Sequence, residues 1–214
     1  MKLQLALDFP SLDSSLRLLE RVRELFDIVE VGTPLVLAVG MRAVSALKHA
    51  SHGLTILADL KIMDAGDLEA RIALEAGADI VTVLALAHAE TIRGVVEAAH
   101  RAGKEAMADL IGVADPSAHL ELLQRSGVDL VCCHTAFDRQ SSGESPTASL
   151  AAVRRAAPNM KIAVAGGIDP VRIRELLPFA PEIVIVGGYV ARASDPRAAA
   201  QALREAAAGA LGPA

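Results

Sequence analysis

Leu54-Thr55-Ile56-Leu57-Ala58-Asp59-Leu60-Lys61-Ile62-Met63-Asp64 is the stretch of this chain that decides its fold. The apolar residues 54–58 predict a strand buried on both faces, which is typical of a parallel sheet covered by helices. Side chains two residues apart share a face of a strand, so Asp59 and Lys61 are expected to point the same way at its end. Charged groups at the end of a buried strand need partners, and this indicates chemistry more than packing.

The same pattern, an apolar strand followed by a helix, repeats along the chain. The predicted strands end near residues 8, 30, 59, 84, 110, 134, 166 and 187, a spacing that fits one strand-helix unit each. Helices are expected over residues 12–26, 39–49, 65–76, 89–101, 116–126, 147–157, 170–177 and 196–208. Three of them begin with Asp-Pro, in which the aspartate caps free backbone N–H groups and the proline, without an N–H, fits the first turn.

Eight strand-helix units in 214 residues predict an α/β fold, a single (β/α)8 barrel over residues 1–214, near the lower size limit of that architecture. The alternative is a doubly wound open sheet, which usually has fewer strands and a glycine-rich loop after the first one. Here that loop is Asp8-Phe9-Pro10-Ser11, without glycine. Residues 138–146, the longest stretch without periodicity, are expected to form either a mobile lid or a surface loop.

Composition restricts the partners of the protein. Aromatic residues make up 2% of the chain and the net charge is −5 without a Lys/Arg cluster, which argues against nucleic acid and anionic membranes. No run of about 18 apolar residues is present, and the first residues lead directly into a strand, so neither a membrane span nor a signal peptide is expected. The adjacent Cys132 and Cys133 would form only a strained disulfide, and a reduced cytoplasmic protein is expected.

Barrel enzymes carry their active site at the carboxyl ends of the strands, and this chain places polar residues there. These residues are Asp8, Glu30, Asp59, Lys61, Asp64, Asp109 and His134. Structural roles remain open for three of them, because Asp8 and Asp64 could cap helices and Asp109 could serve only as a hydrogen-bonding residue at a strand end. Glu30 lies within an apolar strand, where a carboxylate needs a cation or a metal.

Glu30 and Asp59 form a candidate metal site. They are carboxylates at the ends of neighbouring strands, and hard oxygen ligands without clustered thiols or histidines suit Mg²⁺. Asp59 and Lys61 could instead be a structural ion pair, although the surrounding acids favour a functional role. An ion at this place would stabilise the enediolate that forms when a proton leaves a carbon next to a carbonyl.

Two glycine pairs and a histidine complete the predicted site. Gly166-Gly167 and Gly187-Gly188 follow the seventh and eighth strands, where barrels often bind phosphate through backbone N–H groups. His134 is the candidate general base because imidazole titrates near neutrality. Taken together, these residues predict proton or carbon–carbon bond chemistry on a small phosphorylated sugar.

Asp59-x-Lys61-x-x-Asp64 resembles the signature of the orotidine 5′-monophosphate decarboxylase superfamily, and the resemblance covers essentially the whole chain. Residues 29–34 and 63–70 are similar to the branch that contains the 3-hexulose-6-phosphate synthases and the 3-keto-L-gulonate-6-phosphate decarboxylases. The metal-free orotidine decarboxylases carry a lysine in place of Glu30, so that reaction is disfavoured here.

Four positions distinguish the two halves of this branch. The sugar-acid decarboxylases usually carry glutamate, arginine and threonine at the positions of Asp109, Phe137 and Ala165, and arginine at that of Gly188. All four residues of this chain resemble those of the synthases. The resemblance therefore implies an aldehyde-lyase that joins formaldehyde to D-ribulose 5-phosphate in a reversible, Mg²⁺-dependent aldol reaction. The alternatives are the decarboxylase of the same branch and a non-catalytic barrel that binds a sugar phosphate.

The resemblance also implies a role for each residue of the site. Glu30 and Asp59 would hold Mg²⁺, Asp8 would orient substrate or ion, Lys61 would neutralise the enediolate oxygens, His134 would transfer the proton, Asp109 would support substrate hydroxyls, and Gly166, Gly167, Gly187 and Gly188 would bind the phosphate. The equivalent of Asp64 enters the site of the neighbouring subunit, which implies a homodimer with shared active sites.

Overall fold

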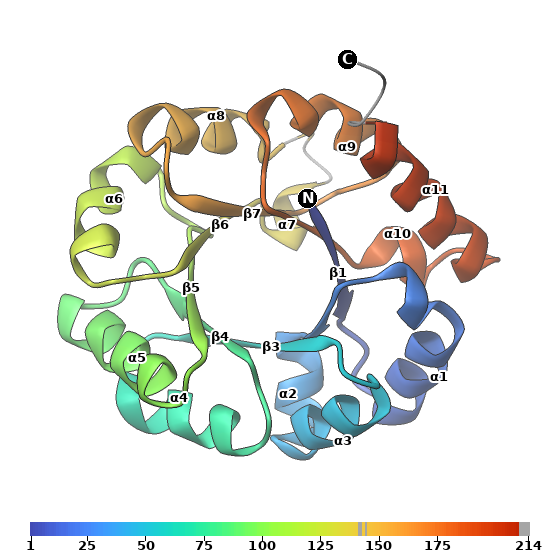
Figure 1. Cartoon of the computed structure of the whole chain (residues 1–214), viewed down its shortest axis with the longest axis horizontal. Coiled ribbons are helices and arrows are strands. Elements are labelled where there is room, and N and C mark those ends of the chain that lie inside the picture. Colours follow the sequence, from blue (N-terminus) through green and yellow to red (C-terminus); the bar gives the residue numbers. More distant parts are fainter. Residues whose placement is uncertain (141–142, 144, 210–214) are drawn as a thin grey trace.

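The computed structural model describes residues 1–140, 143 and 145–209 and contains a closed barrel of eight parallel strands (Figure 1). The strands are β1 (Lys2–Leu7), β2 (Ile28–Val31), β3 (Thr55–Ile62), β4 (Ile80–Leu84), β5 (Glu105–Asp109), β6 (Leu130–His134), β7 (Lys161–Ala165) and β8 (Ile183–Val186). Each strand pairs with the next, and β8 pairs with β1 and closes the ring. The predicted (β/α)8 barrel is confirmed, and the open-sheet alternative is wrong.

Helices follow the strands, and the longer helices form an outer ring around the barrel (Figure 1). They are α1 (Leu12–Val22), α2 (Thr33–Val39), α3 (Arg42–Ala50), α4 (Gly66–Glu75), α5 (Ala89–Arg101), α6 (Pro116–Arg125), α7 (Phe137–Gln140), α8 (Thr147–Ala156), α9 (Pro170–Leu176), α10 (Gly188–Ala191) and α11 (Pro196–Ala208), with 3-10 turns Arg23–Leu25 and Leu177–Phe179. Asp115, Asp169 and Asp195 cap α6, α9 and α11 as predicted. Among the described residues, no helix has both the length and the apolar character needed to cross a bilayer.

Several local features differ from the sequence prediction, among them the short helices α7 and α10, where the sequence predicts no helix. The short helix α2 occupies Thr33–Val39, where the sequence predicts no helix before residue 39. The next helix begins at Arg42 instead of residue 39, because Gly40, with φ of 71°, ends α2. Strand β3 continues past Asp59 to Ile62 through a bulge in which Lys61 adopts a left-handed φ of 50°. Of the loop predicted over 138–146, residues 141, 142 and 144 lie outside the described residues, as do residues 210–214 of the predicted domain.

The alternation of side chains along the strands separates two apolar layers. One fills the space between strands and helices and includes fully buried residues such as Leu5, Val31 and Cys133. The other fills the barrel interior and contains, among others, Leu57, Met107 and Cys132. This interior layer forms the floor of the carboxyl-terminal mouth, where polar side chains replace the apolar ones.

Candidate functional site

A cavity of about 870 Å³ opens at the carboxyl ends of the strands, and it brings together almost all of the predicted site residues. Those that line it are Asp8, Glu30, Asp59, Lys61, Asp109, His134, Gly166, Gly167, Gly187 and Gly188. Asp64 does not line this cavity; it is exposed, and its Oδ1 accepts a hydrogen bond from the backbone N–H of Ala65 at 2.8 Å. Within one chain, Asp64 is therefore apart from the other site residues.

Asp59 is the most fully bonded carboxylate of the cavity. Its Oδ1 accepts from the Thr82 hydroxyl at 2.9 Å, and its Oδ2 accepts from the Thr33 hydroxyl at 2.8 Å and from the Lys61 ammonium. Both threonines come from neighbouring elements, β4 and the start of α2. This network holds Asp59, which is 6% exposed, in one orientation at the end of β3.

The bulge in β3 directs Lys61 towards Asp59. The Lys61 backbone N–H donates to Oγ1 of Thr82 at 3.0 Å, and its Nζ donates to Oγ1 of Thr33 at 3.1 Å. Burial alone would lower the pKa of Lys61, but the negative charge of Asp59 and a hydrogen bond to it, followed by Asp109, raise that pKa above its usual value. Lys61 is therefore a positive charge available to stabilise a developing anion.

Glu30 lies on β2, 8% exposed, at the bottom of the same cavity. Nε2 of Gln4 donates to its Oε2 at 2.6 Å. Burial, and then the negative charges of Asp59 and Asp8, raise the pKa of Glu30 well above its usual value. The carboxylates of Glu30, Asp59 and Asp8 repel one another at this end of the barrel, and a cation in addition to Lys61 would relieve their repulsion.

The donor set at this place fits Mg²⁺. Glu30 and Asp59 offer hard oxygen ligands, and the buried Oε1 of Gln4 has no hydrogen-bond partner in the described part of the chain. A buried polar atom without a partner is costly, and a water of a hydrated ion would satisfy it. Asp8 lies beside the same residues and does not cap α1, because Ser11 does so. Its cap role is excluded.

His134 and Asp109 form a second polar pair on β6 and β5. Nδ1 of His134 lies 2.9 Å from Oδ2 of Asp109, and the backbone N–H of Ile111 donates to Oδ1 at 2.9 Å. Nζ of Lys61 lies 4.0 Å from Oδ2 of Asp109 and connects this pair to the Asp59 network. Because a carboxylate only accepts, Nδ1 of His134 donates to Asp109, which leaves Nε2 as the ring nitrogen that can accept a proton from a substrate.

The structure requires glycine at Gly166, and at Gly188 the absence of a side chain leaves room for the end of a neighbouring arginine. At Gly166, whose φ is 104°, a Cβ atom would lie 2.4 Å from the carbonyl oxygen of Thr135. At Gly188 a Cβ atom would lie 2.5 Å from Nη2 of Arg192. Within the part of the chain that the structure describes, no hydrogen bond or ion pair engages this guanidinium, which lines the cavity. Arg192 is therefore an available cation beside the glycine loop.

The sequence prediction missed several polar residues that line the cavity. Gln4, Thr33, Thr82 and Arg192 are among them. Gln4 carried a signal, because an amide between Leu3 and Leu5 interrupts an apolar strand. Thr33, Thr82 and Arg192 carried none, because threonine is common in strands and near helix starts, and arginine is common near helix ends.

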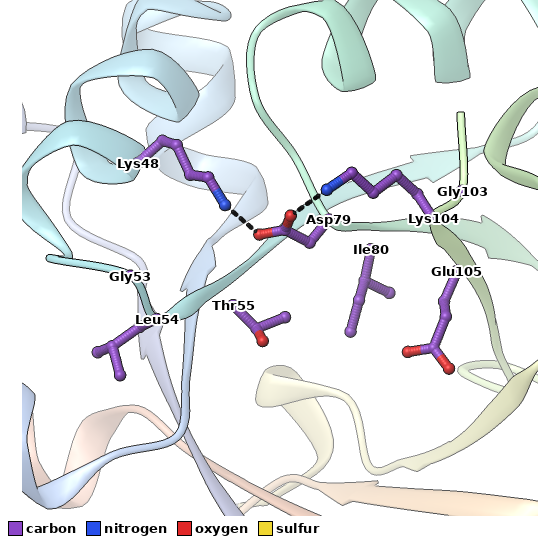
Figure 2. A pocket seen from close by; sticks show the side chains of 9 residues that line it. All are labelled: Lys48, Gly53, Leu54, Thr55, Asp79, Ile80, Gly103, Lys104 and Glu105. Atoms are coloured by element: carbon purple, nitrogen blue, oxygen red, sulfur yellow. Dashed lines mark hydrogen bonds and ion pairs between the residues drawn. The ribbon is translucent and has the colours of Figure 1, made fainter.

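A smaller hollow of about 340 Å³ lies at the opposite, amino-terminal ends of the strands (Figure 2). Lys48 and Lys104 reach Asp79 from two sides, with Nζ to Oδ distances of 2.5 and 2.6 Å. The Ile56 backbone N–H also donates to Asp79, and Glu105 pairs with Lys161, so the charged side chains of this hollow all have partners. Polar residues at this end of a barrel support stability rather than catalysis.

Comparison with known proteins agrees with this geometry. Residues 1–203 match the model of a family described as "Orotidine 5'-phosphate decarboxylase / HUMPS family". The chain belongs to this family. A relative named 3-hexulose-6-phosphate synthase 3, from Staphylococcus saprophyticus, is 44% identical over 206 residues, which cover 96% of this chain and 98% of the relative.

Solved structures of family members have the same fold. The 3-hexulose-6-phosphate synthase from Salmonella typhimurium superposes with a TM-score of 0.95 at 37% identity, covering 98% of this chain and 100% of the other. A 3-keto-L-gulonate-6-phosphate decarboxylase from Vibrio cholerae gives a TM-score of 0.83 at 31% identity over 96% of both chains. The resemblance predicted from the sequence and the predicted class of enzyme are confirmed.

Proposed function

We propose that this protein is a 3-hexulose-6-phosphate synthase, which joins formaldehyde to D-ribulose 5-phosphate in a reversible aldol reaction that gives D-arabino-3-hexulose 6-phosphate. One observation carries this proposal: a single cavity combines a carboxylate–lysine network, a carboxylate–histidine pair and two glycine loops. The similarity to proteins named as such synthases supports the choice of reaction.

Glu30 and Asp59 would hold Mg²⁺, with Gln4 fixing the orientation of Glu30 through its 2.6 Å hydrogen bond. When bound, this ion would supply positive charge beside the substrate oxygens next to the carbon that loses its proton. The Thr33 and Thr82 hydroxyls keep Asp59 in place for that role. The orientation of both carboxylates is therefore set by the protein before any ion binds.

His134 would move the proton at the reacting carbon of the substrate. Its Nε2 accepts that proton, and the electron pair of the broken C–H bond remains on the substrate as an enediolate. Lys61 neutralises the negative oxygens that develop, and the enediolate carbon then forms the new bond to the carbon of formaldehyde. As the double bond of formaldehyde becomes a single bond, its oxygen takes up the proton that His134 accepted, which restores Nε2 as a base. Asp109 acts on His134, as a positioning residue, and stays available to substrate hydroxyls.

The phosphate would lie at the loops that follow β7 and β8. Gly166 and Gly167 have positive φ values, 104° and 65°, which glycine adopts readily, and without side chains they let a phosphate approach their backbone N–H groups closely. Arg192, which packs over Gly188, adds a positive charge that the glycines lack. A planar guanidinium is well suited to a phosphate because it donates two parallel hydrogen bonds.

We further propose a homodimer in which Asp64 completes the partner's site. Asp64 is exposed, and three apolar side chains close to it in the chain are exposed as well, Met63 at 48%, Leu68 at 53% and Ile72 at 46%. Apolar residues that gather on one surface are typical of an interface with another chain. A cytoplasmic location is proposed as well, because the two cysteines are buried as free thiols.

The decisive experiment measures formaldehyde consumption by the purified protein with D-ribulose 5-phosphate, with and without Mg²⁺. Full activity after Mg²⁺ addition, and its loss in a chelator, would support the reaction and the metal. Parallel assays with 3-keto-L-gulonate 6-phosphate test the decarboxylase alternative. Binding of either sugar phosphate without turnover would favour the non-catalytic barrel instead, and it would contradict the proposed reaction.

A further inference from the structure

Cys132 lines the cavity but has no part in the proposed reaction. It lies on β6, two residues before His134, so both side chains point into the barrel. In the strand register Cys132 is directly opposite Asp109 of β5. The ligand atoms of Asp109, Cys132 and His134 all lie within 4.8 Å of one another. A sulfur, a nitrogen and an oxygen ligand therefore meet at one place.

This set of donors differs from the carboxylates on β2 and β3. Thiolate, imidazole and carboxylate are the ligands of zinc and related divalent ions, and three of them with an open fourth position are typical of an accessible zinc site. Glu30 and Asp59 offer oxygen alone, which suits Mg²⁺. The cavity therefore contains two different sets of metal ligands, the hard oxygen ligands Glu30 and Asp59 and the softer set that includes Cys132.

We propose that Asp109, Cys132 and His134 form a second metal site, selective for a borderline divalent cation such as Zn²⁺. Occupation of this site inhibits the enzyme, because the ion takes the ring of His134 and the carboxylate of Asp109 away from proton transfer. The metal-binding part of the proposal stands independently of the proposed function, and only the inhibition rests on it.

The surroundings set limits on the affinity. Burial raises the pKa of Cys132 well above its usual value, so binding must release the thiol proton to water as the metal–sulfur bond forms. The ammonium of Lys61, 4.0 Å from Oδ2 of Asp109, opposes a nearby cation, but it is already bonded to Asp59. Oδ1 of Asp109 stays with the Ile111 backbone, so Oδ2 becomes the ligand, and its hydrogen bond with Nδ1 of His134 must break when the ion binds. The expected affinity is therefore below that of a closed four-ligand site.

Co²⁺, added to the Mg²⁺-loaded protein, tests the binding directly. A cobalt–thiolate bond produces an absorption band that oxygen and nitrogen ligands do not give. We expect this band at one Co²⁺ per chain, its loss in Cys132→Ala and Cys132→Ser, and its displacement by Zn²⁺. The matched control is Cys133→Ala, because the neighbouring thiol packs in the outer apolar layer and does not line the cavity. A band that persists in both Cys132 variants, or no band at all, would overturn the site.

Inhibition provides the second measurement. Zn²⁺ is added at saturating Mg²⁺, and each variant is compared with its own activity without Zn²⁺. We expect the half-inhibitory Zn²⁺ concentration to rise about tenfold or more in Cys132→Ser and to stay unchanged in Cys133→Ala, since loss of one ligand or its support typically costs 10–100-fold in affinity. Relief of the inhibition by further Mg²⁺ would place Zn²⁺ at Glu30 and Asp59 and refute the second site. If the protein has no synthase activity, the cobalt titration still shows whether the second metal site exists.

Discussion

Asp109 and His134 are hydrogen-bonded across two neighbouring strands, with 2.9 Å between Oδ2 and Nδ1. The other oxygen of Asp109 accepts from the backbone N–H of Ile111 at 2.9 Å. Both oxygens therefore have fixed partners, and the carboxylate holds one orientation of the imidazole ring and one position of its proton. The pair has the arrangement of a base and the residue that orients it.

Asp109→Asn is expected to lower kcat by about 100-fold or more, because it moves the ring proton of His134 from Nδ1 to Nε2. The Ile111 N–H still requires an acceptor, so the amide oxygen occupies the Oδ1 position and the NH₂ group faces Nδ1. Nδ1 must then accept a hydrogen bond from the NH₂ group. The ring proton therefore lies on Nε2, which can no longer act as a base. The measurement is kcat for formaldehyde consumption at saturating substrate, with exposed Asp13→Asn as control. An unchanged kcat would remove Asp109 from the mechanism.

Glu30→Gln is expected to raise the melting temperature of the metal-free protein at neutral pH by a few degrees. Burial and the charges of Asp59 and Asp8 raise the folded-state pKa of Glu30, so its charged form is disfavoured in the folded state. The pKa of Glu30 in the unfolded chain is about 4, and the native protein therefore loses stability as the pH rises from there through the higher pKa of the folded state. Glutamine has no charge to bury, so the variant does not lose this stability.

Thermal unfolding in a chelator, measured from about pH 4 to pH 8, checks this prediction. The difference between Glu30→Gln and the native chain should vanish at the acid end, where both side chains are neutral. Mg²⁺ should stabilise the native chain and not the variant, because only the native chain keeps both ligands. The exposed Glu97→Gln is the control. A lower melting temperature for Glu30→Gln at pH 8 in chelator would contradict the charge repulsion.

Arg192→Ala is expected to raise KM for ribulose 5-phosphate about tenfold or more, because a hydrogen bond to a charged group contributes roughly 1.5–3 kcal/mol. Steady-state kinetics over a range of sugar phosphate concentrations measures this change. Arg174→Ala, at an exposed position of α9, is the matched control. An equal KM in Arg192→Ala and in the native protein would show that the glycine loops bind the phosphate without this guanidinium.

Reaction specificity is expected to depend on Asp109, Phe137 and Ala165. All three line the cavity, and Ala165 of β7 is directly opposite His134 in the strand register. The triple variant Asp109→Glu, Phe137→Arg and Ala165→Thr should raise decarboxylation of 3-keto-L-gulonate 6-phosphate relative to the aldol reaction. The ratio of the two rates in the folded variant is the measurement, and a ratio that does not move would assign specificity to other residues.

Mixed dimers test the role of Asp64. Asp64→Asn and Lys61→Ala homodimers should each be nearly inactive if the two residues from different subunits share a site. Random pairing of equal amounts gives about half mixed dimers, in which one site has both defects and the other has neither, so about a quarter of native sites return. Mixed dimers that form without any recovery of activity would place Asp64 in its own subunit's site or in a structural role.

The sequence by itself determined the architecture and most of the candidate site. The regular spacing of apolar strands and helices fixes the order of the elements, because hydrophobic periodicity is a local property of the chain. A parallel barrel then places the ends of all strands around one mouth. Asp59, Asp109 and His134 could therefore be assigned to one cavity from their positions alone.

Only the tertiary structure decided which side chains touch. Arg192 packs over Gly188, Thr33 and Thr82 hold Asp59 from separate elements, and a bulge in β3 turns Lys61 towards Asp59. These contacts depend on strand register, on backbone angles and on loops whose partners are far away in the chain, and none of these follows from local periodicity. A sequence pattern fixes the strand end at which a residue lies, and the closed barrel fixes the neighbours that its side chain meets.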